Sequence, residues 1–284
     1  MFDLKELKKI ELVVFDVDGT LVNDEGEIGV KSKQLIKDLK KQGVLFSFAS
    51  GRLHSALIPI AEELKIHLPL ISLDGSAIKS VTGKQFIYRS FLKEKHVKKA
   101  IEYSEQYVIN IALCHTEAIY YTERNSVIPK LMDKFGATYE KVDSYEGLTD
   151  KTLEIVFAGD NRRTVQFIRD KMSFPFALGL SLSFFNSQTH EGIYYLEARR
   201  SGSSKGRAML RLLKYLNVKE EQTAVLGDWY NDLSLFESKG LKIAINNAIP
   251  ELKKAADYVL KKSNNEEGAA DFLEALLEAK TTKL

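Results

Sequence analysis

Acidic residues follow two short apolar runs of this sequence, at positions where carboxylates could bind a cation. Asp16 and Asp18 come directly after the run Leu12–Phe15, within the motif Asp-Val-Asp-Gly-Thr. Two carboxylates this close repel each other and usually need a cation. The carboxyl end of a parallel strand is also where open α/β sheets bind ligands. An ordinary turn, in which Asp and Gly are common, is the alternative interpretation.

A second acidic group follows the run Thr223–Leu226, in the motif Gly-Asp-Trp-Tyr-Asn-Asp. Asp228, Asn231 and Asp232 supply its polar side chains. Asp232 could instead be the N-cap of a helix over 232–238, and Asn231 a plain loop residue. Two acidic strand ends in one sheet can nevertheless converge on one hard cation, and oxygen ligands suit Mg²⁺.

Two further motifs could bind a phosphate group. Ser50, Gly51 and Arg52 follow the apolar run 45–49, and a hydroxyl with peptide N–H groups ahead of a helix suits an anion. Lys205 opens an expected helix, where a positive charge is unfavourable for the helix dipole unless it faces carboxylates or a phosphate. The alternatives are an ordinary strand-to-helix turn and a solvent-exposed lysine.

The runs that carry these motifs alternate with helical patterns at both ends of the chain. The expected strands are 12–15, 45–49, 70–72, 223–226, 242–245 and 258–260, and the expected helices are 30–42, 55–65, 205–217, 232–238, 250–256 and 266–278. This alternation predicts an α/β fold with a mostly parallel sheet that is covered on both faces.

The middle of the chain has a different pattern, which predicts an α+β insert. A hairpin tip is expected at 79–84. The expected helices are 91–107, 127–135 and 161–172, with Asp160 as the N-cap of the last, and the expected strands are 108–113, 119–122, 152–158, 180–185 and 194–198.

Composition limits the class of protein. The chain has 284 residues with 44% hydrophobic and 28% charged residues, which is ordinary for a globular protein of two domains. Its single cysteine, Cys114, cannot form an internal disulfide, which fits the cytoplasm. A net charge of +2 calls for neither nucleic acid nor an anionic membrane as partner. We expect a soluble, cytoplasmic protein without a signal peptide.

In their order along the chain, the four motifs resemble those of the haloacid dehalogenase superfamily, specifically its Cof-type (class IIB) phosphatases. The segments Asn246–Ala248 and Ser263–Gly268 are similar to the N-A and S-N-x-x-x-G segments of that family. The resemblance covers essentially the whole chain. It implies a Rossmann-like, doubly wound core over 1–83 and 193–284, with a C2-type cap domain over 84–192.

The resemblance also implies a mechanism and an Mg²⁺ cofactor. Asp16 would be the nucleophile that forms a phosphoaspartyl intermediate, and Asp18 the general acid and base. The carboxylates of Asp16 and Asp228 and the backbone carbonyl of Asp18 would bind Mg²⁺. The phosphoryl group would be bound by Ser50, Gly51, Lys205 and Asn231. Arg52 and Asp232 would support these residues without touching the substrate.

The substrate implied by the resemblance is a small phosphorylated metabolite, either a sugar phosphate or a phosphorylated cofactor. A phosphotransferase and a catalytically silent ligand-binding regulator on the same fold are the alternatives. Asp74 departs from the family pattern, since Asn is more common at this position. We expect it to be an ordinary turn residue, although its carboxylate could repel anionic substrates or bind a cationic group.

Overall fold

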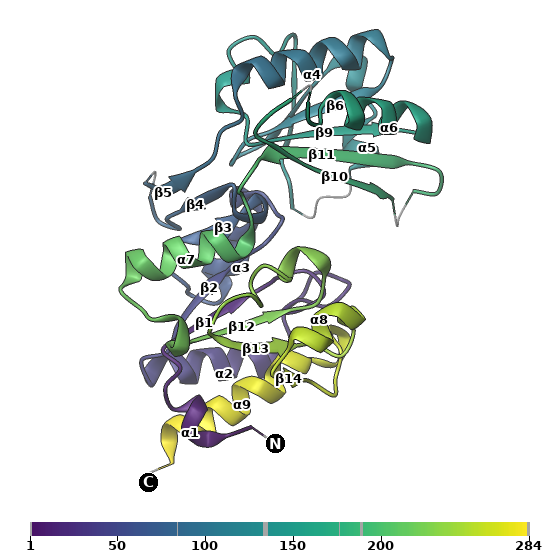
Figure 1. The fold of residues 1–284 in the computed structure, drawn as a ribbon. Helices are drawn as coiled ribbons and strands as arrows, with labels where there is room; N and C mark the ends of the chain where they lie inside the picture. The colour runs from purple at the N-terminus through teal and green to yellow at the C-terminus, as the bar shows by residue number, and fades with distance from the viewer. Residues whose placement is uncertain (1, 84, 133–135, 176, 188–189, 283–284) are drawn as a thin grey trace. The chain divides into compact units, whose positions relative to one another are not determined.

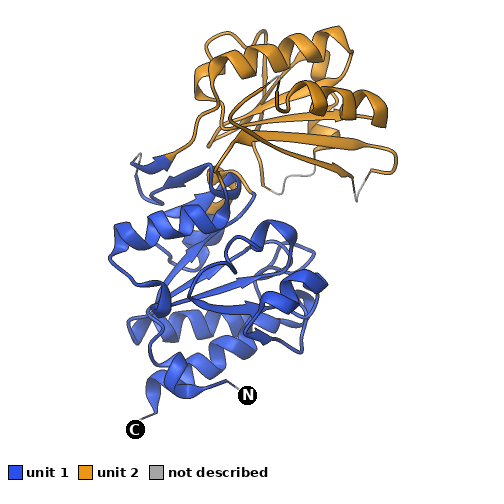
Figure 2. Ribbon diagram, viewed as in Figure 1, with its two compact units in different colours: residues 1–51, 58–88, 204–284 blue, residues 52–57, 89–203 orange. Residues whose placement is uncertain are grey.

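The computed structural model describes residues 2–282 apart from 84, 133–135, 176 and 188–189. The chain folds into two compact units, which Figure 2 shows in different colours. The first unit comprises residues 1–51, 58–88 and 204–284, and the second comprises residues 52–57 and 89–203.

A parallel sheet of five strands forms the centre of the first unit. In spatial order its strands are β14 (Tyr258–Val259), β13 (Leu241–Ala244), β12 (Thr223–Gly227), β1 (Leu12–Phe15) and β2 (Leu45–Phe48). Phe15 at the end of β1 pairs with Leu226 of β12 and with Phe48 of β2. The carboxyl ends of these three strands therefore lie in one row, where the acidic motifs begin.

Helices cover both faces of this sheet. The helices outside residues 89–203 are α1 (Leu4–Leu7), α2 (Val30–Lys41), α3 (His54–Glu63), α7 (Lys205–Leu216), α8 (Pro250–Ala255) and α9 (Gly268–Thr281). The apolar residues of α7 and α8 pack in one cluster with Leu12, Val14 and Val225. On the other face α2 and α9 lie side by side, and α1 packs against α9 (Figure 1). The predicted α/β fold with a covered parallel sheet is confirmed.

A smaller sheet adjoins the edge of the first one. Its strands are β3 (Leu70–Ser72), β4 (Ala77–Lys79) and β5 (Phe86–Arg89), and a tight turn, η1 (Leu73–Gly75), joins the first two. A parallel bridge between Ala49 and Ile71 links it to the end of β2. The expected hairpin tip at 79–84 lies between β4 and β5, with residue 84 outside the described residues.

The second unit is built on a mostly antiparallel sheet, with its two longer helices packed on one face. In spatial order its strands are β10 (Leu180–Asn186), β11 (Tyr194–Arg200), β9 (Glu154–Gly159), β6 (Asn110–Cys114), β7 (Ile119–Thr122) and β8 (Tyr139–Val142). Its helices are α4 (Glu94–Gln106), α5 (Ile128–Leu131) and α6 (Arg162–Lys171). The apolar sides of α4 and α6 pack with Ile111, Phe157 and Leu196 of the sheet. No helix in the described part of the chain combines the length and apolar character needed to cross a bilayer.

The boundaries between the two units differ from those expected at residues 84 and 192, since the second unit comprises residues 52–57 and 89–203. Strand β5 pairs in the small sheet of the first unit, and β11 pairs with β9 and β10 in the second unit. The second unit therefore extends to residue 203, because β10 and β11 form one hairpin. Strand β8 was not expected from the sequence, because its four residues, Tyr-Glu-Lys-Val, place two charged residues side by side and show no alternation of apolar and polar side chains.

Two local predictions are wrong. The expected helix 232–238 is a single 3₁₀ turn, η5 (Tyr230–Asp232), followed by further turns. The N-cap of α6 is Asn161 and not Asp160, since the Asn161 side chain accepts hydrogen bonds from the N–H groups of Arg163 and Thr164. The expected helix at 127–135 is the short α5, and residues 133–135 lie outside the described residues.

Gly206, in the first turn of α7, gives a test of this packing. A Cβ atom at residue 206 would lie 1.8 Å from the carbonyl oxygen of Ser234, which is backbone and cannot move aside cheaply. We predict that Gly206→Ala lowers the free energy of unfolding by about 1–3 kcal/mol, as overpacking does. Urea denaturation measures this change. Gly83→Ala is the control, because its nearest neighbour is the side-chain oxygen of Ser80 at 3.0 Å. Equal stability of both variants would contradict the packing.

Candidate active site

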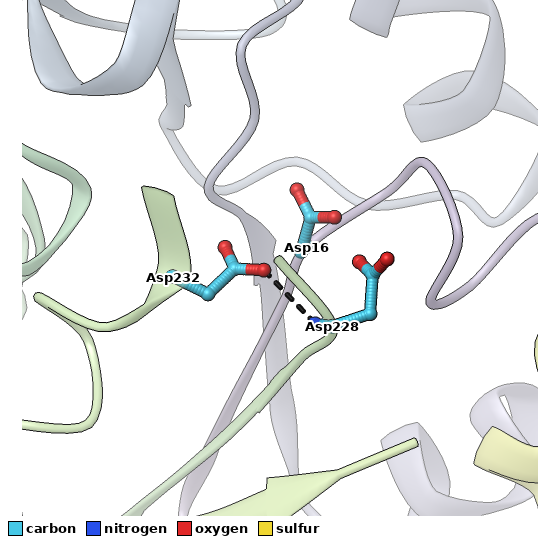
Figure 3. Close-up of side chains that lie close together, drawn as sticks. All are labelled: Asp16, Asp228 and Asp232. Carbon is cyan, nitrogen blue, oxygen red and sulfur yellow. Dashed lines mark hydrogen bonds between the residues drawn. The ribbon is translucent and has the colours of Figure 1, made fainter. Parts of the chain in front are cut away.

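Three carboxylates meet where β1 and β12 end. Asp16 follows β1, Asp228 follows β12, and Asp232 lies in η5. One oxygen of each lies within 4.8 Å of those of the other two, and all three side chains are buried. Figure 3 shows that the carboxylates point into a common space. The predicted convergence of two acidic strand ends is therefore present in the structure.

Lys205 places a buried ammonium group against two of these carboxylates. Its Nζ lies 2.6 Å from Asp16 Oδ1 and 2.7 Å from Asp232 Oδ1, and the residue is only 1% exposed. Burial alone would lower the pKa of Lys205, but the charges of Asp16 and Asp232 outweigh it and raise the pKa above its ordinary value. The group therefore stays cationic in the interior.

The start of helix α7 fixes the position of this lysine. Ser204 is the N-cap, and its hydroxyl accepts a hydrogen bond from the N–H of Arg207. Successive turns of α7 then bury Ala208, Leu212 and neighbouring apolar residues against the sheet. The positive charge of Lys205, which is unfavourable at a helix N-terminus, is thus compensated by two carboxylates, one of the possibilities that the sequence indicated.

Both carboxylate oxygens of Asp232 accept hydrogen bonds. Its Oδ2 accepts from the N–H groups of Asp228 at 3.0 Å and Trp229 at 3.1 Å, while Oδ1 accepts from Lys205. Gly227 makes this possible, because a Cβ atom there would lie 2.7 Å from the Asp232 side chain. These bonds explain why no helix starts at Asp232: its carboxylate caps the preceding loop instead of the following turn.

Asp16 and Asp228 lie in surroundings that oppose their ionisation. Burial and the charge of Asp232 raise the pKa of Asp228 to about 7, although the hydroxyl of Thr20, 3.0 Å from Oδ1, opposes this. Burial, followed by the charge of Asp232, holds the pKa of Asp16 well above its ordinary value. A single lysine does not balance the carboxylates, and a further cation would.

The donor set fits a divalent cation. Carboxylate oxygens are preferred ligands of hard ions such as Mg²⁺. Both oxygens of Asp232 accept hydrogen bonds, whereas Lys205 and Thr20 contact only Oδ1 of Asp16 and of Asp228, so these two side chains are better placed to bind an ion directly. The Asp18 side chain is exposed and is close enough for its charge to raise the pKa of Asp16. Gly19, with φ of +72°, lets the chain turn tightly past Asp228.

The predicted phosphate-binding residues of the first unit also lie close together. The amide nitrogen of Asn231 donates to Oδ1 of Asp74 at 2.9 Å, and the N–H of Asp74 donates to the carbonyl of Ser50 at 3.0 Å. A Cβ atom on Gly51 would lie 3.3 Å from the same Asp74 oxygen. Arg52 is buried, and it begins the segment 52–57 that belongs to the second unit.

Two residues in this arrangement received no functional role from the sequence. Thr20, the last residue of the first acidic motif, holds the Asp228 carboxylate. Asp74 contacts Asn231 and was expected to be an ordinary turn residue. The sequence held one signal for a role of Asp74, which was its position: Asp74 follows a third strand, β3, whose end lies beside that of β2.

Comparison with known proteins identifies the family. A family model described as haloacid dehalogenase-like hydrolase matches residues 13–273. The chain belongs to this family. The match includes both acidic motifs, Lys205 and the whole second unit, as the order of the motifs predicted.

Two relatives that are named phosphatases match this haloacid dehalogenase-like hydrolase over nearly their whole length. The chain is 25% identical to "Phosphatase YwpJ" of Bacillus subtilis, covering 94% of this chain and 100% of the relative. It is 26% identical to the 5-amino-6-(5-phospho-D-ribitylamino)uracil phosphatase YwtE of the same organism, covering 94% and 98%. A hydrolase structure from Bacteroides thetaiotaomicron shares the fold, with a TM-score of 0.78, 24% identity, and coverage of 93% and 98%. These findings confirm the predicted Cof-type phosphatase.

Removal of the buried ammonium group tests the electrostatics of the site. Lys205→Met would leave buried carboxylates without their cation, and we expect the free energy of unfolding to fall by about 3–5 kcal/mol at neutral pH. Because Lys205 lowers the pKa of Asp16 and Asp228, its loss raises both further above their unfolded values. The folded variant then binds more protons than the unfolded chain, so its stability falls as pH rises from about 4 to 8.

Urea denaturation of the metal-free proteins at several pH values checks this prediction. Lys214→Met, at an exposed position of the same helix, is the matched control and should change little. A Lys205→Met protein as stable as the parent at pH 8 would contradict the ion pairs.

Proposed function

We propose that this protein is an Mg²⁺-dependent phosphatase that hydrolyses a small phosphorylated metabolite through a phosphoaspartyl intermediate. The observation that carries the proposal is the buried Lys205, held between Asp16 and Asp232 beside Asp228. An ammonium group and a bound cation in the same site would offset the two negative charges of a phosphate ester. The family membership supports the same activity.

Asp16 is the proposed nucleophile. Its carboxylate attacks the phosphorus atom, an O–P bond to Asp16 forms, and the bond from phosphorus to the ester oxygen breaks. Burial raises the pKa of Asp16, so the nucleophile needs neighbouring positive charge to remain ionised. Lys205 supplies part of that charge at 2.6 Å. A bound Mg²⁺, held by Asp16, Asp228 and the carbonyl of Asp18, would offset the repulsion between the carboxylate and the ester.

Asp18 is the proposed general acid and base. Two residues after the nucleophile, its exposed side chain can give a proton to the departing alcohol oxygen. It can then take a proton from the water that attacks phosphorus, which releases phosphate and restores Asp16. The exposed position of Asp18 beside the buried Asp16 suits these two different roles.

The remaining residues hold the phosphoryl group. Ser50, the N–H of Gly51, Lys205 and Asn231 are proposed to bind its oxygens, since hydroxyl, amide and ammonium donors suit that group. Asp232 orients Lys205 and the loop at Asp228 by its hydrogen bonds. Arg52 is proposed to support the loop that it follows.

The substrate is proposed to be a sugar phosphate or a phosphorylated cofactor or cofactor precursor. The printed name of the relative YwtE describes a phosphatase for a phosphorylated ribitylamino compound, which falls within this class. We also propose that the protein works in the cytoplasm, without a nucleic-acid or membrane partner, on the basis of its lone cysteine and small net charge.

Substitution of the nucleophile tests the reaction. Asp16→Asn keeps the size of the side chain but removes the charge that attacks phosphorus, and we predict at least a ~10³-fold loss of kcat. Hydrolysis of p-nitrophenyl phosphate with Mg²⁺ and with EDTA measures this loss. Asp38→Asn, on helix α2, should keep the activity of the parent. Near-normal, Mg²⁺-dependent turnover by Asp16→Asn would disprove the assignment. Transfer of the phosphoryl group to the hydroxyl of an added sugar, instead of to water, would favour a phosphotransferase.

The single tryptophan provides a test of cation binding without turnover. Trp229 comes directly after the proposed ligand Asp228, and its backbone N–H donates a hydrogen bond to the Asp232 carboxylate. We expect Mg²⁺ to change the fluorescence of Trp229 in a saturable way, and EDTA to reverse the change. Asp228→Asn should weaken the response, because it removes one anionic ligand. A parent protein with no response to Mg²⁺ would speak against a metal site at this loop.

A further inference from the structure

The turn η1 (Leu73–Gly75) is held in an unusual backbone conformation beside the phosphate-binding residues. Its three residues all have positive φ, with 48° for Leu73, 49° for Asp74 and 90° for Gly75. Non-glycine residues rarely adopt this region, and such strain persists only where the surroundings enforce it. At Gly75 a Cβ atom would lie 2.2 Å from the carbonyl of Ser204, so the turn packs directly on the start of α7.

In this conformation the N–H and the carboxylate of Asp74 each bond to a proposed phosphate-binding residue. Its N–H donates to the carbonyl of Ser50 at 3.0 Å, and its Oδ1 accepts from the Asn231 amide at 2.9 Å. The residue is 8% exposed, and its charge helps to raise the pKa of Lys205. Asp74 thus bonds to Ser50 and Asn231, and it also lies close to Gly51 and acts on the charge of Lys205.

The chemistry of a carboxylate gives this contact a direction. An ionised carboxylate can only accept hydrogen bonds, whereas an amide has an N–H₂ end and an oxygen end. Asp74 therefore excludes the flipped orientation of Asn231, in which two oxygens would face each other. One N–H of the Asn231 amide is bonded to Asp74, and the second stays available as a donor for a phosphoryl oxygen.

We infer that Asp74 is a positioning residue of the phosphate site, which acts by fixing the orientation of the Asn231 amide. The inference rests on the proposed function, because it assumes that Asn231 donates to phosphate. It replaces the expectations that Asp74 is an ordinary turn residue, repels substrates or binds a cationic group. The Asp74 side chain acts on the site by accepting a hydrogen bond from Asn231, and its backbone N–H holds the loop at Ser50 by donating to the Ser50 carbonyl.

The left-handed backbone supplies two variants that keep the turn intact. Asp74→Gly removes the carboxylate and adopts positive φ without strain. Asp74→Asn also tolerates this conformation and keeps a side-chain oxygen that can accept from Asn231. The dissociation constant of inorganic phosphate, measured by titration calorimetry with Mg²⁺ present, reports on the site without turnover. Thermal unfolding verifies that each variant is folded.

We expect Asp74→Gly to weaken phosphate binding by about fivefold to tenfold, which corresponds to the loss of one ordinary hydrogen bond. Asp74→Asn should lie between the parent and Asp74→Gly, within about threefold of the parent, because an acceptor oxygen remains but the amide no longer dictates which end of Asn231 faces it. Asn231→Ala should weaken binding as well, and the double variant Asp74→Gly with Asn231→Ala should bind within about twofold of Asn231→Ala alone. Such non-additivity is the sign of residues that act through one another.

Three results would overturn the inference: Asp74→Gly binding within about twofold of the parent, Asp74→Asn binding as weakly as Asp74→Gly, or single effects that multiply in the double variant. Each of these leaves the proposed function standing if the parent hydrolyses p-nitrophenyl phosphate. A parent that neither binds phosphate nor hydrolyses this ester would contradict the proposed function, and the role of Asp74 would fall with it.

Discussion

The ion pairs of Lys205 with Asp16 and Asp232 are the interaction on which the rest of the site depends. A buried ammonium group is tolerated only when carboxylates compensate it, and these carboxylates in turn need its charge. The cluster still contains more negative than positive groups, which leaves Asp16 and Asp228 with raised pKa values. The same imbalance suits a site that must hold a cation and an anionic ester together.

The fold meets this constraint with few elements. Parallel strands β1 and β12 end in one row, so residues over two hundred positions apart in the chain become neighbours. Helix α7 positions the lysine at the same edge, and its close approach to Ser234 requires glycine at residue 206. Hydrogen bonds of Asp232 then fix the loop that carries Asp228. The geometry is built from backbone register and from side chains that cannot easily move.

Much of this arrangement was predictable from the sequence, and the exceptions have physical reasons. The strand ends could be placed because carboxyl ends of parallel strands share one edge. The expected helix after Asp232 does not form, because that carboxylate bonds backward to the N–H groups of Asp228 and Trp229. The contact of Asp74 with Asn231 could not be foreseen, since it depends on three successive left-handed residues of which only one is glycine. Strand β11 joined the second unit through long-range pairing that no local pattern specifies.

The claim that Asp16 carries the phosphoryl group can be tested directly by trapping it. The Mg²⁺-loaded protein would be mixed with a phosphate ester, quenched in acid within the first turnover, and digested for mass spectrometry. The account predicts that the peptide containing Asp16 gains one phosphoryl group, and that mild base removes it, as expected of an acyl phosphate. A phosphoryl group found on another residue, or rapid hydrolysis without any labelled peptide, would contradict the account.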